Sequence, residues 1–244
     1  MTKPQTLTAA LVTACSTHAE SVCLETADGK AWTYGDIDAL AQRMATVLLD
    51  QGVVVGDRVL AQIDKSVAAV ALYLACLRVG AAYVPLNTAY TAGELDYFVA
   101  DAQPALCVCR QQDEAEFGAR LESVPVLSLS ADHKGSLMRA AGEAEPTAAV
   151  AAVQPTSVAA ILYTSGTTGR SKGAMLTQHN LLSNALTLVD LWGWQADDVL
   201  LHALPIFHVH GLFVALHCQQ QGLEHTLSGM PAGNDPSGAL YGGR

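Results

Sequence analysis

The sequence predicts an α/β protein built on doubly wound, mostly parallel sheets. Short apolar runs alternate along the chain with segments whose apolar residues recur at helical spacing. Thr-x-x-acidic signatures at Thr33 and Thr91 mark the starts of two helices. The connections between apolar runs are long enough to carry a helix, which parallel strand pairing requires.

The elements of the first part follow in order. The Asp28-Gly29 pair between two extended segments is typical of a hairpin. A glycine at position 80 is expected to stop the third helix. The predicted helices cover residues 7–15, 33–51, 66–77 and 91–101. The predicted strands cover residues 59–63, 82–86, 105–109 and 124–129.

Composition divides the chain near its middle. Residues 139–155 are rich in Ala and Glu and contain prolines, which is typical of a surface connection. We therefore expect a first sub-domain over residues 1–138, a connection over 139–157 and the start of a second sub-domain over 158–216. The second part is predicted to contain strands at 158–163 and 199–204 and helices at 180–192 and from 210.

The pattern changes at residue 217. Glycine and proline become frequent, and neither helical nor strand periodicity is visible. Residues 217–244 are therefore expected to be an atypical, disordered tail. The abrupt change favours a shifted or prematurely ended reading frame over a divergent loop that closes a short protein.

Composition also limits the partners. Half of the 244 residues are apolar, and the formal net charge of −10 argues against nucleic acid or an anionic membrane as a partner. The six cysteines show no C-x-x-C spacing and are expected to be reduced thiols in the core. Without an apolar run that could span a bilayer, the chain is expected to be soluble and cytoplasmic. Residues 3–15 could form a signal peptide, but a single cation and interrupting threonines favour an amphipathic helix.

The segment TSGTTGRSKG, residues 164–173, is the strongest functional signal. It follows the apolar run 158–163, and its glycines, including Gly173, permit positive φ and close backbone approach to an anion. Each hydrogen bond to a charged oxygen contributes roughly 1.5–3 kcal/mol. The candidate phosphate-binding residues are Thr164, Ser165, Gly166, Thr167, Thr168, Gly169, Arg170 and Lys172.

Two other interpretations of this segment compete. A cluster of glycine, serine and threonine is often only a solvated loop. A Walker A loop requires a lysine followed directly by Ser or Thr, whereas Lys172 stands between Ser171 and Gly173. The register is therefore wrong for a P-loop NTPase.

The same segment resembles the signature of the adenylate-forming superfamily: acyl-CoA synthetases, luciferases and the adenylation domains of peptide synthetases. Further family motifs occur in the family's order, at residues 32–36, 77–86 and 205–211. Within the superfamily, residues 85–98 and 202–215 look most like malonyl-CoA synthetases. The resemblance covers about residues 7–216, so it implies the N-terminal large domain of the adenylate-forming fold, incomplete.

The resemblance implies an ATP-dependent acid–CoA ligase. In such enzymes a carboxylate attacks the α-phosphate of ATP, pyrophosphate leaves, and coenzyme A then attacks the acyl-adenylate. It implies ATP, Mg²⁺ and coenzyme A, with malonate as the expected acid. His208 is the implied catalytic and substrate-binding residue and His210 a second substrate-binding residue, although a histidine beside apolar residues can also be structural. No metal ligand is predicted, and His202, Asp64 and Lys65 are expected to serve packing or solvation.

Several family motifs have no counterpart in this sequence. They are the aromatic-Gly-x-Thr-Glu motif, the ribose-binding aspartate, the hinge and the C-terminal lysine. The chain alone is therefore expected to be inactive. Two alternatives remain: a non-catalytic module that binds a nucleotide or a partner, and a ligase for another, longer or aromatic, acid.

Overall fold

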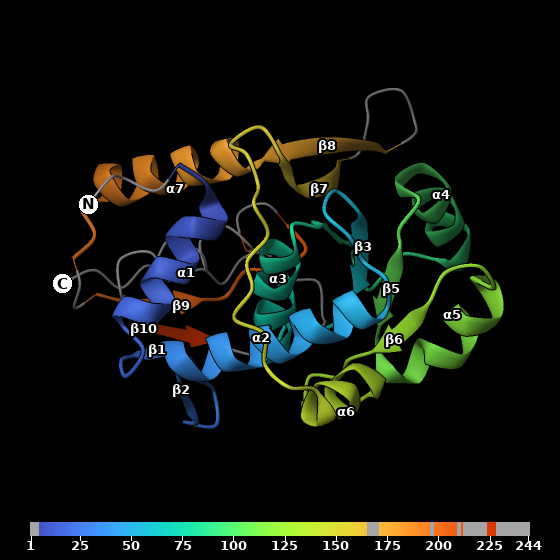
Figure 1. The fold of residues 1–244 in the computed structure, drawn as a ribbon, viewed down its shortest axis with the longest axis horizontal. Coiled ribbons are helices and arrows are strands. Elements are labelled where there is room, and N and C mark those ends of the chain that lie inside the picture. Colours follow the sequence, from blue (N-terminus) through green and yellow to red (C-terminus); the bar gives the residue numbers. More distant parts are fainter. Residues whose placement is uncertain (1–4, 165–170, 196–197, 209–210, 212–223, 228–244) are drawn as a thin grey trace.

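The computed structural model describes residues 5–164, 171–195, 198–208, 211 and 224–227, which form two sheets surrounded by helices (Figure 1). The six-stranded sheet has the order β6-β5-β3-β4-β7-β8. Its strands are β3 (Arg58–Gln62), β4 (Ala82–Pro85), β5 (Leu106–Cys109), β6 (Val126–Ser128), β7 (Val158–Thr164) and β8 (Lys172–Thr177). The four-stranded sheet contains β2 (Ala31–Thr33), β1 (Val22–Thr26), β10 (Glu224–Leu227) and β9 (Val199–His202) in this order.

Local capping chemistry sets the starts of the helices. Thr33 and Thr91 each form a capping box with the acidic residue three positions later, as predicted, and Thr177 forms another with Asn180. Gly80 ends α3 at φ 75°, a left-handed conformation that favours glycine. The helices are α1 (Leu7–Thr17), α2 (Tyr34–Asp50), α3 (Val67–Val79), α4 (Ala92–Ala102), α5 (Glu114–Arg120), α6 (Ser136–Glu143) and α7 (Gln178–Trp192), with a 3₁₀ turn, η1 (Gln111–Asp113).

The larger sheet is doubly wound, which confirms the predicted fold class. From β3 the chain moves to β4 on one side and then crosses back to β5 on the other, and all pairs from β6 to β7 are parallel. Only β8 runs antiparallel, to β7. Such an order places a topological switch point between β3 and β5.

Both faces of this sheet are buried at its central strands β3, β4 and β5. Val59 and Val108 belong to one hydrophobic core with α2 and α3, whereas Leu60 and Cys107 belong to a second core with α4 and α5. Alternate residues of a strand point to opposite faces, so a sheet covered on both sides needs uninterrupted apolar strands. All residues of α3 are buried, including Arg78, whose guanidinium pairs with the carboxylate of Asp38 on α2.

The smaller sheet begins with the predicted hairpin. β1 and β2 pair antiparallel around Gly29, which has φ 81°. β10 lies between β1 and β9 and runs parallel to both. The expectation of no regular structure after residue 217 is therefore wrong for residues 224–227, because strand pairing on both sides satisfies the backbone of a segment without side-chain periodicity. The rest of the expected tail and the helix expected from 210 fall outside the described residues.

Two short helices, α5 and α6, were not predicted. α6 occupies the start of the expected connection, and Ser136 in its first turn donates a 2.5 Å hydrogen bond to Glu114 of α5. Gly135 precedes it at φ 113°, where a Cβ atom would lie 2.3 Å from the carbonyl oxygen of Ser128. The division into sub-domains stays a prediction, and strand pairing crosses it because β7 pairs with β4.

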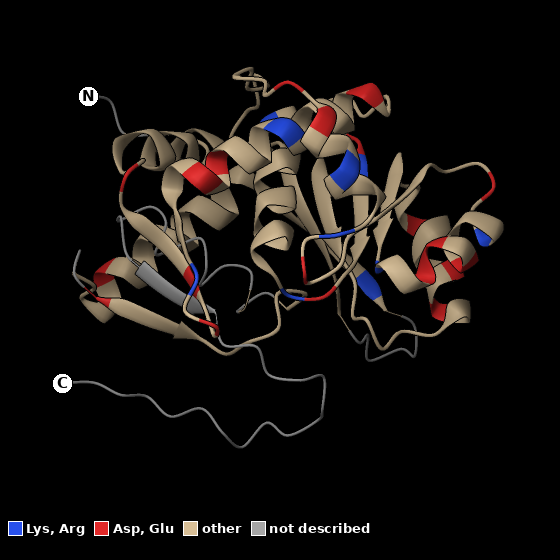
Figure 2. Ribbon diagram, turned by 90° about the horizontal axis from the view of Figure 1, so that it is seen from below, with Lys and Arg blue, Asp and Glu red and all other residues tan. Residues whose placement is uncertain are grey.

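Burial and charge agree with the composition. Cys15, Cys107 and Cys109 are buried, and desolvation raises the pKa of each thiol to about 12, so these thiols stay protonated. In the described part of the chain, no helix is long and apolar enough to cross a membrane. Figure 2 shows acidic positions distributed over the helices with fewer basic ones among them, in line with the net charge of −10.

Large apolar side chains remain exposed on three elements that follow one another in the second half of the chain. Met175 of β8 is 67% exposed, Leu191 of α7 is 72% exposed and Val199 of β9 is 59% exposed. β8 and β9 are also edge strands of their sheets. These elements therefore present apolar surface and unpaired strand edges to their surroundings.

Candidate functional site

β7 and β8 frame the candidate phosphate loop. β7 is an apolar strand that ends at Thr164, and β8 begins at Lys172 and returns antiparallel to it. Thr164 and Lys172 are register partners, so the structure places these two residues opposite each other at the ends of the loop. Both residues are exposed. The other predicted loop residues, Ser165, Gly166, Thr167, Thr168, Gly169 and Arg170, lie outside the described residues.

Gly173 contributes close packing and not a positive φ. It lies in β8 opposite Tyr163 and is not among the residues of the described chain with positive φ. A Cβ atom there would lie 3.0 Å from Cγ2 of Ile161 and 3.3 Å from Cε1 of Tyr163. The expected positive φ is therefore wrong for Gly173, because an extended strand needs no left-handed residue. The expected close approach of its backbone to an anion stays a prediction.

Helix α4 contacts both limbs of the hairpin. The hydroxyl of Tyr97 donates a 2.6 Å hydrogen bond to the carbonyl oxygen of Ser171. The hydroxyl of Tyr163 donates a 2.6 Å hydrogen bond to Oδ2 of Asp101. Burial raises the pKa of Tyr163, and the adjacent Asp101 carboxylate raises it further, so this hydroxyl remains a donor. Sequence reasoning missed both tyrosines.

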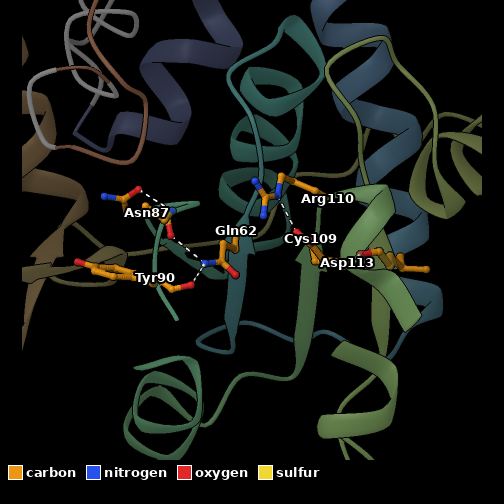
Figure 3. A network of polar contacts seen from close by, with 8 residues as sticks. Gln62, Asn87, Tyr90, Cys109, Arg110 and Asp113 are labelled. Carbon is orange, nitrogen blue, oxygen red and sulfur yellow. Dashed lines mark hydrogen bonds and ion pairs between the residues drawn. The ribbon is translucent and has the colours of Figure 1, made fainter. Parts of the chain in front are cut away.

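The carboxyl edge of the larger sheet carries further polar contacts. β7 runs parallel to β4, so its last residue, Thr164, lies at the same edge as the ends of β3 and β5. Gln62, the last residue of β3, is 4% exposed and donates from Nε2 to the carbonyl oxygen of Asn87 at 2.8 Å (Figure 3). Arg110 after β5 pairs with Asp113 at 2.6 Å. A buried glutamine at the end of an apolar strand is the sequence signal that could have identified this edge.

His208 belongs to the segment that follows β9. It is exposed, its backbone N–H donates to the carbonyl oxygen of Pro205 at 3.3 Å, and its ring lies 4.5 Å from that of Phe207. Within residues 171–195 and 198–208, no hydrogen bond or ion pair joins His208 to Lys172, so their joint role in one site stays a prediction. His210 lies outside the described residues.

His202, in β9, contacts the segment that follows β9. It is 2% exposed, and its Nε2 lies 2.6 Å from the carbonyl oxygen of Gly211, which requires that this nitrogen carries the proton. Gly211 packs so tightly that a Cβ atom would lie 1.9 Å from the carbonyl oxygen of Pro205. The ammonium group of Lys65, which follows β3, donates to the carbonyl oxygen of His202. Lys65 and His202 therefore connect the two sheets, which goes beyond their expected role in packing or solvation.

Mg²⁺ that enters with ATP is usually held by one or two carboxylates together with phosphate oxygens. No group of three or more His, Cys, Asp or Glu side chains within the described residues could hold a metal ion. The donor set that the described loop ends do provide, one hydroxyl and one ammonium group, suits phosphate oxygens.

Comparison with known proteins identifies similar chains. A family model described as AMP-binding enzyme matches residues 11–237, which extends 21 residues beyond the expected limit of 216. The oxalate–CoA ligase of Arabidopsis thaliana is 31% identical over 75% of this chain and 37% of its own length. The mitochondrial malonate–CoA ligase ACSF3 of Homo sapiens is 36% identical over 57% of this chain and 24% of its own length.

Solved structures give the same picture. ATP-bound MatB from Rhodopseudomonas palustris has a TM-score of 0.87 and 46% sequence identity, over 91% of this chain and 45% of that chain. VinN has a TM-score of 0.79 at 24% identity, which reflects the fold alone. The chain thus spans less than half the length of the curated relatives and of MatB.

The burial of His202 predicts that folding stability depends on pH. Desolvation, with the charge of Lys65 second, lowers the pKa of His202 from 6.5 to about 4, so between these values the unfolded state binds the proton more tightly. The contribution of His202 to the free energy of unfolding is therefore fully present above about pH 6.5 and decreases as the pH falls towards 4. The free energy of unfolding should be lower by about 2 kcal/mol at pH 5. In urea unfolding at pH 7.5 and pH 5, the His202→Asn variant should lose less stability than the wild type.

The exposed His179 provides the control for this measurement. His179→Asn should keep the full loss of stability between pH 7.5 and pH 5. An equal loss in the wild type and in His202→Asn would contradict a neutral, buried His202.

Proposed function

The chain belongs to the AMP-binding enzyme family, and from this premise we propose that residues 164–173 bind the phosphates of ATP in an acid–CoA ligase. The family match covers most of the chain, and relatives of this chain are CoA ligases for several acids.

The observation that carries the proposal is the pairing of Thr164 with Lys172. An antiparallel strand pair holds their backbones in register at the ends of a loop whose sequence is rich in glycine and hydroxyl groups. Both side chains are exposed and therefore accessible to a nucleotide. Hydrogen bonds from a charged donor to phosphate are stronger than neutral ones, so Lys172 would contribute the larger share of the affinity.

The proposed reaction proceeds in two steps. An oxygen of the acid attacks the α-phosphorus, the bond from this phosphorus to the β-phosphate bridge oxygen breaks, and pyrophosphate leaves with that electron pair. The thiolate of coenzyme A then attacks the acyl carbon and AMP leaves. Lys172 would stabilise the negative charge that grows on the departing pyrophosphate, which lowers the barrier of the first step. Mg²⁺ bound with ATP would neutralise further phosphate charge.

We propose malonate as the acid. The support is the similarity to a malonate–CoA ligase and to MatB, and the sequence around His208. In this proposal the imidazoles of His208 and His210 hydrogen-bond to a carboxylate of the acid. Turnover would also need segments equivalent to the remainder of the relatives, of which this chain spans less than half the length.

Replacing the loop-end donors should weaken ATP binding. Loss of one hydrogen bond from a charged group costs about 1.5–3 kcal/mol, so Lys172→Ala should raise the dissociation constant about ten- to a hundredfold. Thr164→Val removes a neutral donor and should raise it less than about tenfold. Isothermal titration calorimetry measures both effects. Lys134→Ala, which removes an exposed lysine paired with Asp132, should bind ATP like the wild type; unchanged affinity in Lys172→Ala would place the nucleotide elsewhere.

Substitutions at His208 and at Lys172 should change the Michaelis constants of different substrates. The chain can be joined to the polypeptide that follows the matched region in the Rhodopseudomonas palustris MatB, and malonate-dependent pyrophosphate release then measured. His208→Ala should raise the KM for malonate about tenfold and leave the KM for ATP unchanged, since only the acid loses a hydrogen bond. Lys172→Ala should do the reverse. A His208→Ala variant with an altered KM for ATP and an unaltered KM for malonate would refute the assignment of His208 to the acid.

A further inference from the structure

Two tyrosines tie helix α4 to the hairpin that carries the phosphate loop. Tyr97 reaches from α4 to the carbonyl oxygen of Ser171, and Tyr163 reaches from β7 back to the carboxylate of Asp101 on α4. Both hydrogen bonds are 2.6 Å long, and they run in opposite directions between the same two elements. We call this pair the tyrosine clasp.

Aromatic packing holds the clasp in place. The ring of Phe98 lies 4.5 Å from that of Tyr163 and 5.5 Å from that of Tyr97, measured between centroids. The rings of Tyr97 and Tyr163 are 6.3 Å apart and nearly perpendicular. Phe98 is 1% exposed and belongs to the core beneath α4. The two hydroxyls are therefore presented by rings that have little freedom to move.

The two hydrogen bonds of the clasp involve the residues that directly precede the two loop-end donors. Tyr163 is followed directly by Thr164, and Ser171 is followed directly by Lys172. The peptide unit between Ser171 and Lys172 is planar and trans, so holding its carbonyl oxygen toward α4 directs the N–H of Lys172 away from α4. Each limb of the loop is thus fixed one residue before the group that we assign to phosphate.

The hydroxyls are not needed for α4 to form or to pack. Its start is fixed by the capping box of Thr91 and Glu94, and its buried face consists of Leu95, Phe98 and Ala102. A tyrosine-to-phenylalanine change keeps the ring and removes only the hydrogen bond. The function of the hydroxyls can therefore be separated from the stability of the fold.

We propose that Tyr97 and Tyr163 are positioning residues for the nucleotide: through the clasp, α4 sets the place of Thr164 and Lys172 before ATP binds. This rests on the proposed assignment of residues 164–173 to ATP phosphates. Pre-positioned donors bind more tightly because less conformational freedom is lost on binding. The clasp would contribute to ATP affinity without touching ATP.

The test compares ATP and AMP binding in the Tyr97→Phe and Tyr163→Phe variants by calorimetry. Each should bind ATP about fivefold more weakly and AMP nearly unchanged, since the loop serves the phosphates that AMP lacks, with the thermal unfolding midpoint close to that of the wild type. Tyr90→Phe is the matched control: its ring lies 4.9 Å from that of Phe98, and it should bind both nucleotides like the wild type.

A second measurement does not depend on the nucleotide. Without ATP, amide hydrogen exchange at Lys172 and Gly173 should be faster in Tyr97→Phe than in the wild type, because the clasp no longer limits local opening. Faster exchange with unchanged ATP affinity would overturn the positioning role. If exchange at Lys172 and Gly173 is slower in the wild type than in Tyr97→Phe but the wild type binds no ATP, the proposed function is refuted, and the positioning role with it.

Discussion

Burial of the central strands β3, β4 and β5 on both faces of the six-stranded sheet is the constraint on which the rest of the structure depends. Parallel strands need helical crossovers, and here α2 and α3 cover one face while α4 and α5 cover the other. Strand residues such as Val59 and Leu60 must therefore both be apolar although they point to opposite sides. Polar side chains therefore occur at the ends of these strands and not within them. Gln62, at the end of β3, is an example.

This position of the polar side chains explains where the candidate site lies. The parallel pairing of β7 with β4 aligns Thr164 with the carboxyl ends of the other strands, and the antiparallel return in β8 brings Lys172 beside it. α4 then contributes to the site because it covers the same end of the sheet, where Tyr97 reaches Ser171. The fold thus supplies a rigid base for the ends of a loop whose sequence carries the proposed phosphate-binding groups.

The sequence predicts the features that depend on residues close to one another in the chain. The capping boxes at Thr33 and Thr91, the stop at Gly80 and the strand before Thr164 all follow from residues close to one another in the chain. Contacts between distant residues could not be predicted in this way: Tyr97 and Ser171 are 74 positions apart, and Lys65 and His202 are 137 apart. The short helix α6 and the strand β10 belong to the same class, because tertiary contacts and not periodicity stabilise them.

We propose above all that the phosphates of ATP bind between Thr164 and Lys172. The most direct measurement is a two-dimensional amide NMR titration of the chain with ATP, with backbone assignments for the residues at both loop ends. We predict that the largest shifts occur at Thr164, Ser171, Lys172 and Gly173 and that they are smaller with adenosine, which lacks phosphates. Shifts confined to the ends of β3 and β5, near Gln62 and Arg110, or equal shifts with adenosine, would contradict the claim.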